Sequence, residues 1–250
     1  MTKQRANTLI LLPAHNESGR IGNVIQGVRE TGLHADILVV DDGSSDTTPA
    51  DAKARGAKVV SHPFNLGYGS ALLTGYLYAR RHGYKRLVQM DADGQHDPNS
   101  VPSMLDALGR GADVVVGSRY ISGDAPETTL LRRWGSRLFA LIVTKWTGVK
   151  VTDPTSGFQA MNQNAIAELA HDGFPEDYPD ADVLITLSRA GLELTEIPVQ
   201  MHPRRGGVSM HRGGRAAYYA YKMMLTLCLL PWRRRSPFRS SQVATASAES

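Results

Sequence analysis

The first 120 residues alternate between short apolar runs and longer segments with spaced apolar positions, and this alternation restricts the fold more than any other feature of the chain. The apolar runs are Thr8–Leu12, Ile37–Val40, Lys58–Ser61, Leu87–Met90 and Val114–Val116. The helix-length segments between them are Ile21–Arg29, Thr47–Arg55, Ala71–Arg81 and Val101–Leu108. Strands without polar alternation are buried on both faces. The pattern therefore predicts an α/β fold, Rossmann-like, with a mostly parallel sheet covered by helices.

Polar clusters follow directly after four of the predicted strands. They are His15-Asn16-Glu17, Asp41-Asp42-Gly43-Ser44, Asp91-Ala92-Asp93 and Gly117-Ser118-Arg119. In open α/β sheets the ligand crevice lies outside the carboxyl ends of the strands. The four clusters therefore predict one binding site at that edge of the sheet.

The chain after residue 120 is less regular, and it is predicted to add a few elements and a C-terminal extension. We expect helices over Leu130–Trp146, Asn162–Ala170 and Asp182–Ala190, a turn over Asp153–Gly157 and a strand over Leu192–Gln200. A Gly/Arg-rich loop then leads to an apolar helix, and the Ser/Ala/Arg-rich tail has the composition of a disordered segment. The expected division is a folded domain over residues 1–210, an amphipathic helix over 211–232 and a basic tail over 233–250.

Asp91 and Asp93 form a pair of carboxylates two residues apart, on a turn just past a predicted strand. Such a pair can converge on one hard cation, and Mg²⁺ or Mn²⁺ held partly by substrate phosphates suits it. The same residues also fit a plain Asp-Gly turn that leads into the next helix.

A second acidic cluster lies at another strand end, at Asp41 and Asp42. The residues that follow fit a helix cap, with Ser45 or Asp46 capping a helix from Thr47. Capping leaves Asp41 and Asp42 unexplained, and carboxylates in this position can accept hydrogen bonds from a base or a ribose.

Composition and missing motifs exclude several classes of protein. The single cysteine, Cys228, can form neither an internal disulfide nor a multi-cysteine zinc cluster, and both points suit a reducing cytoplasm. No phosphate-binding P-loop, dinucleotide glycine fingerprint or serine-hydrolase elbow is present in the sequence. The longest apolar segment, Ala216–Trp232, is shorter than a membrane-spanning helix, and residues 1–7 lack the pattern of a secretory signal.

The charge of +4 is unevenly distributed. Nine of the 28 Lys and Arg residues and one of the 24 Asp and Glu residues lie at or beyond residue 201, which leaves 19 basic and 23 acidic residues before it. A basic end of this kind can meet nucleic acid, an anionic lipid surface or a phosphorylated substrate, or it can simply be solvated. The acidic body, and the lack of any helix-turn-helix, RNP or zinc-finger pattern, argue against nucleic acid.

Seven segments, taken in order, resemble glycosyltransferase family 2 enzymes with the GT-A fold, and among them the polyprenyl-phosphate hexose synthases. They are Leu12-Pro13-Ala14-His15-Asn16-Glu17, Val39-Val40-Asp41-Asp42-Gly43-Ser44-Ser45-Asp46-Thr47-Thr48, Asn65-Leu66-Gly67-Tyr68-Gly69-Ser70-Ala71 with Gly75, Met90-Asp91-Ala92-Asp93-Gly94-Gln95-His96-Asp97-Pro98, Gly117-Ser118-Arg119-Tyr120, Asp153-Pro154-Thr155-Ser156-Gly157-Phe158, and Glu196-Ile197-Pro198-Val199 followed by Arg204-Arg205-Gly206-Gly207-Val208-Ser209. They cover about residues 8–210, which would form the GT-A catalytic domain.

The resemblance implies a role for each residue that matches these motifs. The nucleotide sugar would be bound by Pro13, His15, Glu17, Val40, Asp42, Asp91, Ala92, Arg204 and Arg205. The metal ion, Mg²⁺ or Mn²⁺, would be held by Asp91, Asp93 and Gln95. The catalytic set would be Asp153, Arg119, Arg132 and Arg133, with Arg119 and one of Arg132 or Arg133 facing an acceptor phosphate. Asp153 would act either as a base or as an organiser of the site.

The implied reaction moves a hexose from GDP- or UDP-hexose to a polyprenyl phosphate, dolichyl or undecaprenyl, with inversion. The alternative is transfer to a saccharide hydroxyl in glycan assembly, which would need a firm base and an open sugar cleft. Because a polyprenyl tail is apolar, we expect a peripheral protein on the cytoplasmic face of an anionic membrane. The predicted helices over Leu130–Trp146 and Ala216–Trp232 would lie at the interface, or would instead pack on the sheet or on a second subunit. A small membrane-protein partner would add an anchor.

Overall fold

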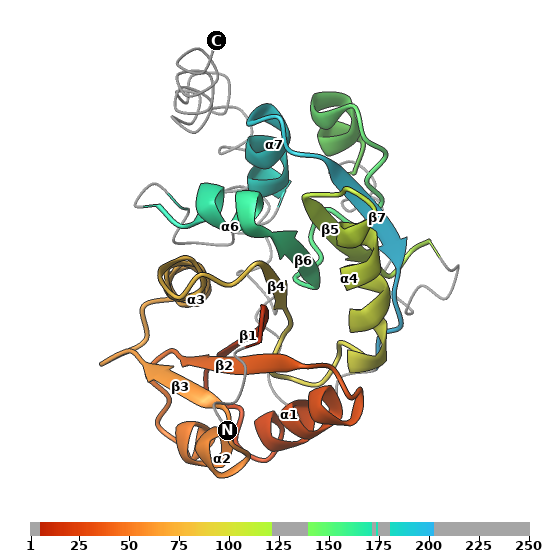
Figure 1. The fold of residues 1–250 in the computed structure, drawn as a ribbon. Coiled ribbons are helices and arrows are strands. Elements are labelled where there is room, and N and C mark those ends of the chain that lie inside the picture. Colours follow the sequence, from red (N-terminus) through yellow and green to blue (C-terminus); the bar gives the residue numbers. More distant parts are fainter. Residues whose placement is uncertain (1–5, 122–139, 172–173, 175–180, 203–250) are drawn as a thin grey trace, which may run out of the picture.

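The fold is a seven-stranded sheet with helices on both faces (Figure 1), seen in a computed structural model that describes residues 6–121, 140–171, 174 and 181–202. The strands are β1 (Thr8–Ala14), β2 (Ala35–Asp41), β3 (Lys58–Ser61), β4 (Arg86–Gln89), β5 (Val114–Ser118), β6 (Gln159–Asn162) and β7 (Leu194–Pro198). The helices are α1 (Ile21–Glu30), α2 (Thr48–Ala54), α3 (Tyr68–Arg81), α4 (Val101–Gly109), α6 (Gln163–Leu169) and α7 (Ala181–Arg189), with further helical residues at 140–147. The α/β prediction is confirmed.

The strand order is β3-β2-β1-β4-β6-β5-β7. The pairs β1–β2, β2–β3, β1–β4 and β5–β7 are parallel, as the alternation of strands and helices predicts. β6 is antiparallel to both of its neighbours, so that Ala160 faces Val88 of β4 on one side and Val115 of β5 on the other. β6 is not among the predicted strands, because its four residues, Gln-Ala-Met-Asn, contain no β-branched side chain and lack the apolar run that marks the other buried strands.

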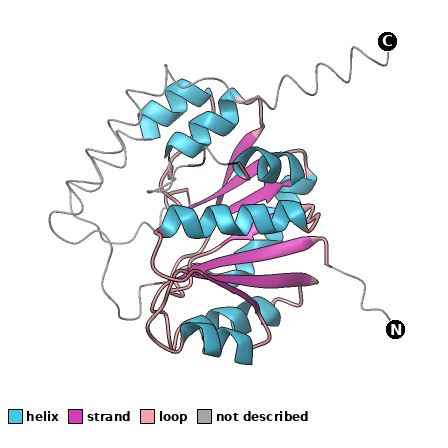
Figure 2. Cartoon of the chain, turned by 90° about the vertical axis from the view of Figure 1, so that its left-hand side faces the viewer, coloured by secondary structure: helices cyan, strands magenta, loops and turns pink. Residues whose placement is uncertain are grey.

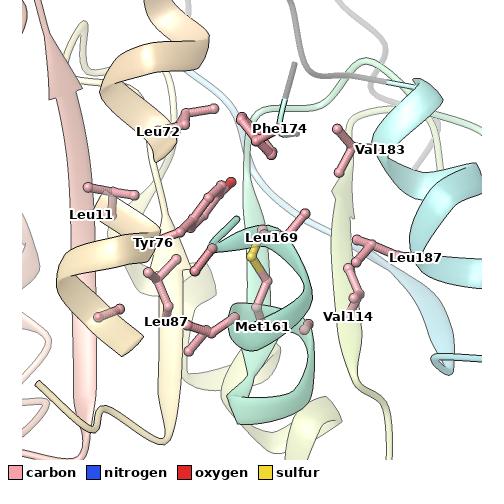
Figure 3. Packing of buried hydrophobic residues seen from close by; sticks show 14 of the residues in the cluster. Leu11, Leu72, Tyr76, Leu87, Val114, Met161, Leu169, Phe174, Val183 and Leu187 are labelled. Carbon is pink, nitrogen blue, oxygen red and sulfur yellow. The ribbon is translucent and has the colours of Figure 1, made fainter. Parts of the chain in front are cut away.

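The core has two layers because alternate side chains of each strand point to opposite faces of the sheet. On β1, Leu9 and Leu11 belong to one buried cluster, whereas Ile10 and Leu12 belong to the other. The first cluster, shown in part in Figure 3, packs under α3, α6 and α7. The second packs under α1 and α4. Figure 2 shows the helices on both sides of the sheet in a second view.

Helix α1 illustrates how the sequence periodicity builds the second layer. Its buried side chains are Ile21, Val24, Ile25 and Val28. These positions recur at intervals of three and four residues, so they form one apolar stripe along the helix. Each such side chain contributes about 1.5–3 kcal/mol when it leaves water, and the stripe therefore fixes α1 against the sheet.

Helix α3 approaches β1 closely at Gly75. A Cβ atom at this position would lie 2.4 Å from the Cδ atoms of Leu11 and 2.9 Å from its Cγ. Leu11 is fully buried, so it has no room to withdraw. Glycine at position 75 thus allows the helix to lie directly on the strand.

The helices and the strand predicted after residue 150 are confirmed as α6, α7 and β7, each within two residues at most of the predicted ends. The helix predicted over Leu130–Trp146 is described only from residue 140, where it runs to residue 147. The segments predicted as an amphipathic helix (211–232) and a basic tail (233–250) lie outside the described residues, as does the end of the predicted first domain. Among the helices that the structure describes, none has the length and apolar character needed to span a membrane.

Candidate active site at the carboxyl edge of the sheet

The loops after β1 and β2 are joined by hydrogen bonds into one rigid surface. The amide of Glu17 donates to the Thr48 hydroxyl at 2.8 Å, and the amide of Ser45 donates to the side-chain carbonyl of Asn16 at 2.9 Å. Asn16 adopts a left-handed backbone conformation (φ 55°), which asparagine tolerates better than most residues. The predicted nucleotide-binding residues His15 and Glu17 therefore sit on a preformed loop pair.

The start of α2 differs slightly from the predicted cap. The helix begins at Thr48, one residue later than expected, and its N-cap residue Thr47 makes no capping bond with its side chain. Asp46 instead accepts hydrogen bonds from both the amide and the hydroxyl of Thr48. Slight burial would raise the pKa of Asp46, but these hydrogen bonds outweigh it and lower that pKa below its ordinary value.

Asp42 is buried and holds the loop between β3 and α3. Its carboxylate accepts hydrogen bonds from the amides of Leu66 (2.8 Å) and Gly67 (2.9 Å), and it contacts Nδ1 of His62 at 2.7 Å. We predicted from sequence that Asp42 binds the base or ribose; in the structure the carboxylate shapes the loop that starts α3. The side chains of Pro13, Val40 and Ala92, also predicted at the nucleotide, are buried.

The turn after β4 carries the two carboxylates predicted to bind metal. Asp93 accepts hydrogen bonds from the amide (3.0 Å) and from the side-chain nitrogen (2.8 Å) of Gln95, so all three predicted metal ligands belong to one short turn. Asp91 accepts a hydrogen bond from the hydroxyl of Tyr68 at 3.1 Å and keeps about a third of its side chain exposed. The carboxylates are thus oriented by neutral donors and remain accessible.

His96 lies beneath this turn and stacks on Phe158, with ring centroids 4.7 Å apart. Its Nδ1 accepts a hydrogen bond from the amide of Asp91. Burial lowers the pKa of His96, although the charges of Asp91 and Asp93 act in the opposite direction. A neutral imidazole supports the turn without neutralising its carboxylates.

The end of β5 and the turn before β6 are linked by a buried ion pair. Arg119 binds both oxygens of Asp153 through Nε and Nη2, each at 2.7 Å, and its amide donates to the same carboxylate at 3.2 Å. Asp153 is fully buried, while about a fifth of the Arg119 side chain is exposed. Burial alone would lower the pKa of Arg119, but the contact with Asp153 raises it above its ordinary value, so the guanidinium stays charged.

Glu196 on β7 completes this network, and no role was predicted for it from sequence. Its carboxylate accepts hydrogen bonds from the amides of Thr152 and Asp153 and from the Thr152 hydroxyl, at 2.8–3.0 Å. It therefore fixes the backbone that presents Asp153. The signal for Glu196 in the sequence is its place in the segment Glu196-Ile197-Pro198-Val199 at a strand end. Its partner Asp153 lies 43 residues earlier, so only the fold brings the two residues together.

The acidic turn and the Arg119–Asp153 pair share one electrostatic environment. The charges of Asp91 and Asp93, and also those of Arg119 and Asp153, act on the pKa of His96. The chain after β7 returns to the same turn, where the amide of His202 donates to the carbonyl of Gln95 at 2.7 Å. The predicted site residues Arg132, Arg133, Arg204 and Arg205 lie outside the described residues.

The donors of the β4 turn fit a hard divalent cation. Asp91, Asp93 and the Gln95 amide offer oxygen atoms, which Mg²⁺ and Mn²⁺ prefer. Over the described residues, no three or more His, Cys, Asp or Glu side chains gather in a metal-binding arrangement. Two carboxylates and one amide leave positions on such a cation for phosphate oxygens and water.

The seven-stranded, mostly parallel sheet, with helices on both faces and polar side chains at its carboxyl edge, is shared with glycosyltransferases of the GT-A fold. The sequence profile described as "Glycosyl transferase family 2" matches residues 9–170, and the chain belongs to this family.

Two relatives are polyprenyl-phosphate enzymes by name. An undecaprenyl-phosphate mannosyltransferase of Micrococcus luteus is 30% identical over 82% of this chain and 88% of its own length. A polyprenol monophosphomannose synthase of Mycolicibacterium smegmatis is 31% identical over 86% of this chain and 85% of its own.

Solved structures share the fold. Glucosyl-3-phosphoglycerate synthase of Mycobacterium tuberculosis, in complex with phosphoglyceric acid, superposes with a TM-score of 0.69 and 25% identity over 91% of this chain and 80% of its own. The same enzyme in complex with Mn²⁺ and UDP-glucose has a TM-score of 0.65 and 23% identity over 91% of this chain and 79% of its own.

Proposed function

We propose that this protein transfers a hexose from a nucleoside-diphosphate sugar to a polyprenyl phosphate, with inversion at the anomeric carbon. The observation that carries the proposal is the placement of the Asp91–Asp93 turn beside the turn that carries Asp153, where a Cβ atom at Gly157 would lie 3.3 Å from Asp91 Oδ1. The first turn fits a diphosphate with its cation, and the Arg119–Asp153 pair fits an acceptor that is itself a phosphate. The names of the two bacterial relatives support the same acceptor class.

The acceptor explains why an arginine matters more than a base. A phosphate monoester has a second pKa of about 6, so at pH 7 it is mostly a dianionic nucleophile already. One of its oxygens attacks the anomeric carbon, the bond from that carbon to the diphosphate oxygen breaks, and the nucleoside diphosphate leaves with the electron pair. In-line attack of this kind inverts the configuration. No proton has to be removed from the acceptor.

Arg119 is the described residue best suited to position that acceptor. Its guanidinium stays charged and is partly exposed, while Asp153 holds Nε and Nη2 on the buried side. Nη2 also donates to the Thr155 hydroxyl at 3.4 Å, and the guanidinium donors beyond these contacts can bind phosphate oxygens, which a planar guanidinium does well. Both oxygens of Asp153 are engaged and the residue is fully buried, which favours a role as organiser over a role as base.

Asp91, Asp93 and Gln95 would hold the divalent cation, which when bound offsets the charge that builds on the leaving diphosphate. The complex of the structural neighbour with Mn²⁺ and UDP-glucose supports a divalent cation in this fold. Gln95 keeps Asp93 in one orientation before the ligand binds, and Tyr68 does the same for Asp91. The loop pair of His15 and Glu17 would border the nucleotide.

The direct test is a screen of GDP- and UDP-hexoses for transfer to a short-chain polyprenyl phosphate, with Mg²⁺ and with Mn²⁺. We expect one sugar donor to give a polyprenyl-phosphate hexose of inverted configuration. Saccharide acceptors form the second arm of the screen. Transfer to a saccharide hydroxyl with no transfer to the lipid phosphate would overturn the proposal in favour of a glycan-extending enzyme.

A further inference from the structure

Tyr68 occupies a fixed position between α3 and the acidic turn. It is the first residue of α3, directly after Leu66 and Gly67, whose amides are bound by Asp42 at the end of β2. Gly67 has a φ of 99°, a conformation that glycine adopts without cost. The tyrosine side chain is half-buried against the first core cluster. Its hydroxyl is therefore placed by the fold before any ligand arrives.

The hydroxyl of Tyr68 is part of a directed chain of hydrogen bonds that begins in the core. The Tyr76 hydroxyl donates to the Gln89 carbonyl oxygen at 2.5 Å, and the Gln89 side-chain nitrogen donates to the Tyr68 oxygen at 3.1 Å. The Tyr68 hydrogen then points to Asp91 Oδ1, also at 3.1 Å. The Tyr68 hydroxyl thus accepts a hydrogen bond from the Gln89 side-chain nitrogen and donates one to the carboxylate of Asp91.

The Tyr76 end of this series of hydrogen bonds is buried in the core. Tyr76 and Gln89 are both buried, and the Tyr76 ring packs edge-on against Phe174 with centroids 5.3 Å apart. Figure 3 shows Tyr76 projecting from α3 into the core. Gln89 and Asp91 lie two residues apart at the end of β4, and both reach Tyr68.

Gly157 packs against the hydrogen bond between Tyr68 and Asp91. A Cβ atom at this position would lie 3.0 Å from the Tyr68 hydroxyl oxygen and 3.3 Å from Asp91 Oδ1. The turn before β6 thus covers the hydrogen bond between these two residues. Exclusion of water on that side strengthens the bond and restricts the carboxylate to one orientation.

We propose that Tyr68 is a positioning residue that fixes Asp91 for the divalent cation and diphosphate, through a relay anchored at Tyr76. The inference rests on the proposed function of the acidic turn. Partners that orient a metal-binding carboxylate typically alter metal affinity 10–100-fold. Tyr68 acts through Asp91, so its hydroxyl matters only when the cation is bound.

The test compares Tyr68→Phe with the wild-type protein. Calorimetry measures the binding of UDP and GDP, first with Mn²⁺ and then in EDTA. The affinity for Mn²⁺ is measured separately, from the electron paramagnetic resonance signal of the unbound ion. We expect Tyr68→Phe to weaken Mn²⁺-dependent binding by about 10–100-fold and to leave metal-free nucleotide binding unchanged. Tyr78→Phe is the matched control, since Tyr78 lies ten residues along the same helix and stacks on His82.

A second variant, Gly157→Ala, crowds the same hydrogen bond without removing the hydroxyl, and it should reproduce the selective loss. Mn²⁺-dependent binding by Tyr68→Phe within twofold of wild type would overturn the role of Tyr68, and so would an equal loss with and without Mn²⁺. Absence of Mn²⁺-dependent nucleotide binding in the wild type would instead overturn the proposed function of the turn, and this inference with it.

Discussion

At the scale of single residues, Asp93 is the sharpest probe of the acidic turn. It accepts two hydrogen bonds from Gln95 within its own turn, and it belongs to neither core cluster. We expect Asp93→Ala to reduce transfer by on the order of 10²-fold or more, because a cation ligand is lost, while thermal unfolding changes little. Assays at saturating donor check this. Near-normal turnover there would rule out Asp93 as a metal ligand.

Arg119 tests the acceptor side of the site. We expect Arg119→Lys to raise the acceptor KM or to lower kcat by at least about tenfold, because an ammonium cannot reproduce a bidentate guanidinium fork. Steady-state kinetics with varied polyprenyl phosphate measure both constants. The control is Arg110→Lys, an exposed position at the C-terminal end of α4. Unchanged acceptor kinetics in Arg119→Lys would leave Arg119 with a structural role alone.

The sequence indicates polar residues at strand ends more readily than it indicates their hydrogen-bond partners. Arg119 and Asp153 were both predicted, but their ion pair joins positions 34 residues apart and depends on the turn before β6. Asp42 is predicted to bind a base or ribose, and the sequence does not indicate that its carboxylate also binds the amides of Leu66 and Gly67. Residue type and a strand-end position indicate that a side chain is polar and near the site. They do not indicate which donors the fold will bring to it.

At the scale of elements, the contact between α3 and β1 depends on Gly75. We expect Gly75→Ala to lower the free energy of unfolding by about 1–3 kcal/mol, because the added methyl group must displace Leu11 or lift the helix. Gly109→Ala is the matched control: it also lies in a helix but has no atom within 4 Å of the added Cβ. Better helix propensity should leave that variant as stable as wild type or more stable, by up to about 1 kcal/mol.

Urea unfolding of the two variants measures the difference. Equal stability of Gly75→Ala and Gly109→Ala would contradict the close approach of α3 to β1.

Four helices and five strands of the first 120 residues could be predicted because their apolar periodicity is local. β6 could not, because what makes its four residues a strand is the gap between β4 and β5, which are neighbours in sequence but not in the sheet.

At the scale of the whole molecule, charge and exposed apolar side chains predict attachment to a membrane surface. The chain carries a net charge of +8 from residue 201 onward and −4 before it. The helix at residues 140–147 also exposes Leu141 and Trp146. Each basic residue close to an anionic surface contributes about 1 kcal/mol. We expect the protein to float with anionic liposomes at low salt and to be released at high salt.

Neutral liposomes and a variant with Arg233, Arg234 and Arg235 changed to Gln are the controls for this flotation assay. The variant should bind anionic liposomes more weakly at every salt concentration. Salt-independent binding to neutral liposomes would contradict an electrostatic mechanism, and no binding to either kind would remove the membrane prediction.

The position of β6 also sets the order in which the molecule can be completed as it is synthesised. β1 to β4 can pair as soon as residue 89 has emerged, because they form a contiguous half of the sheet. β5 emerges soon afterwards but has no strand to pair with until residues 159–162 and 194–198 arrive. The residues of the acidic turn after β4 therefore emerge long before Arg119 can meet Asp153. A nascent chain would therefore form the Arg119–Asp153 pair only after β6 and β7 have been synthesised, well after the first half of the sheet is complete.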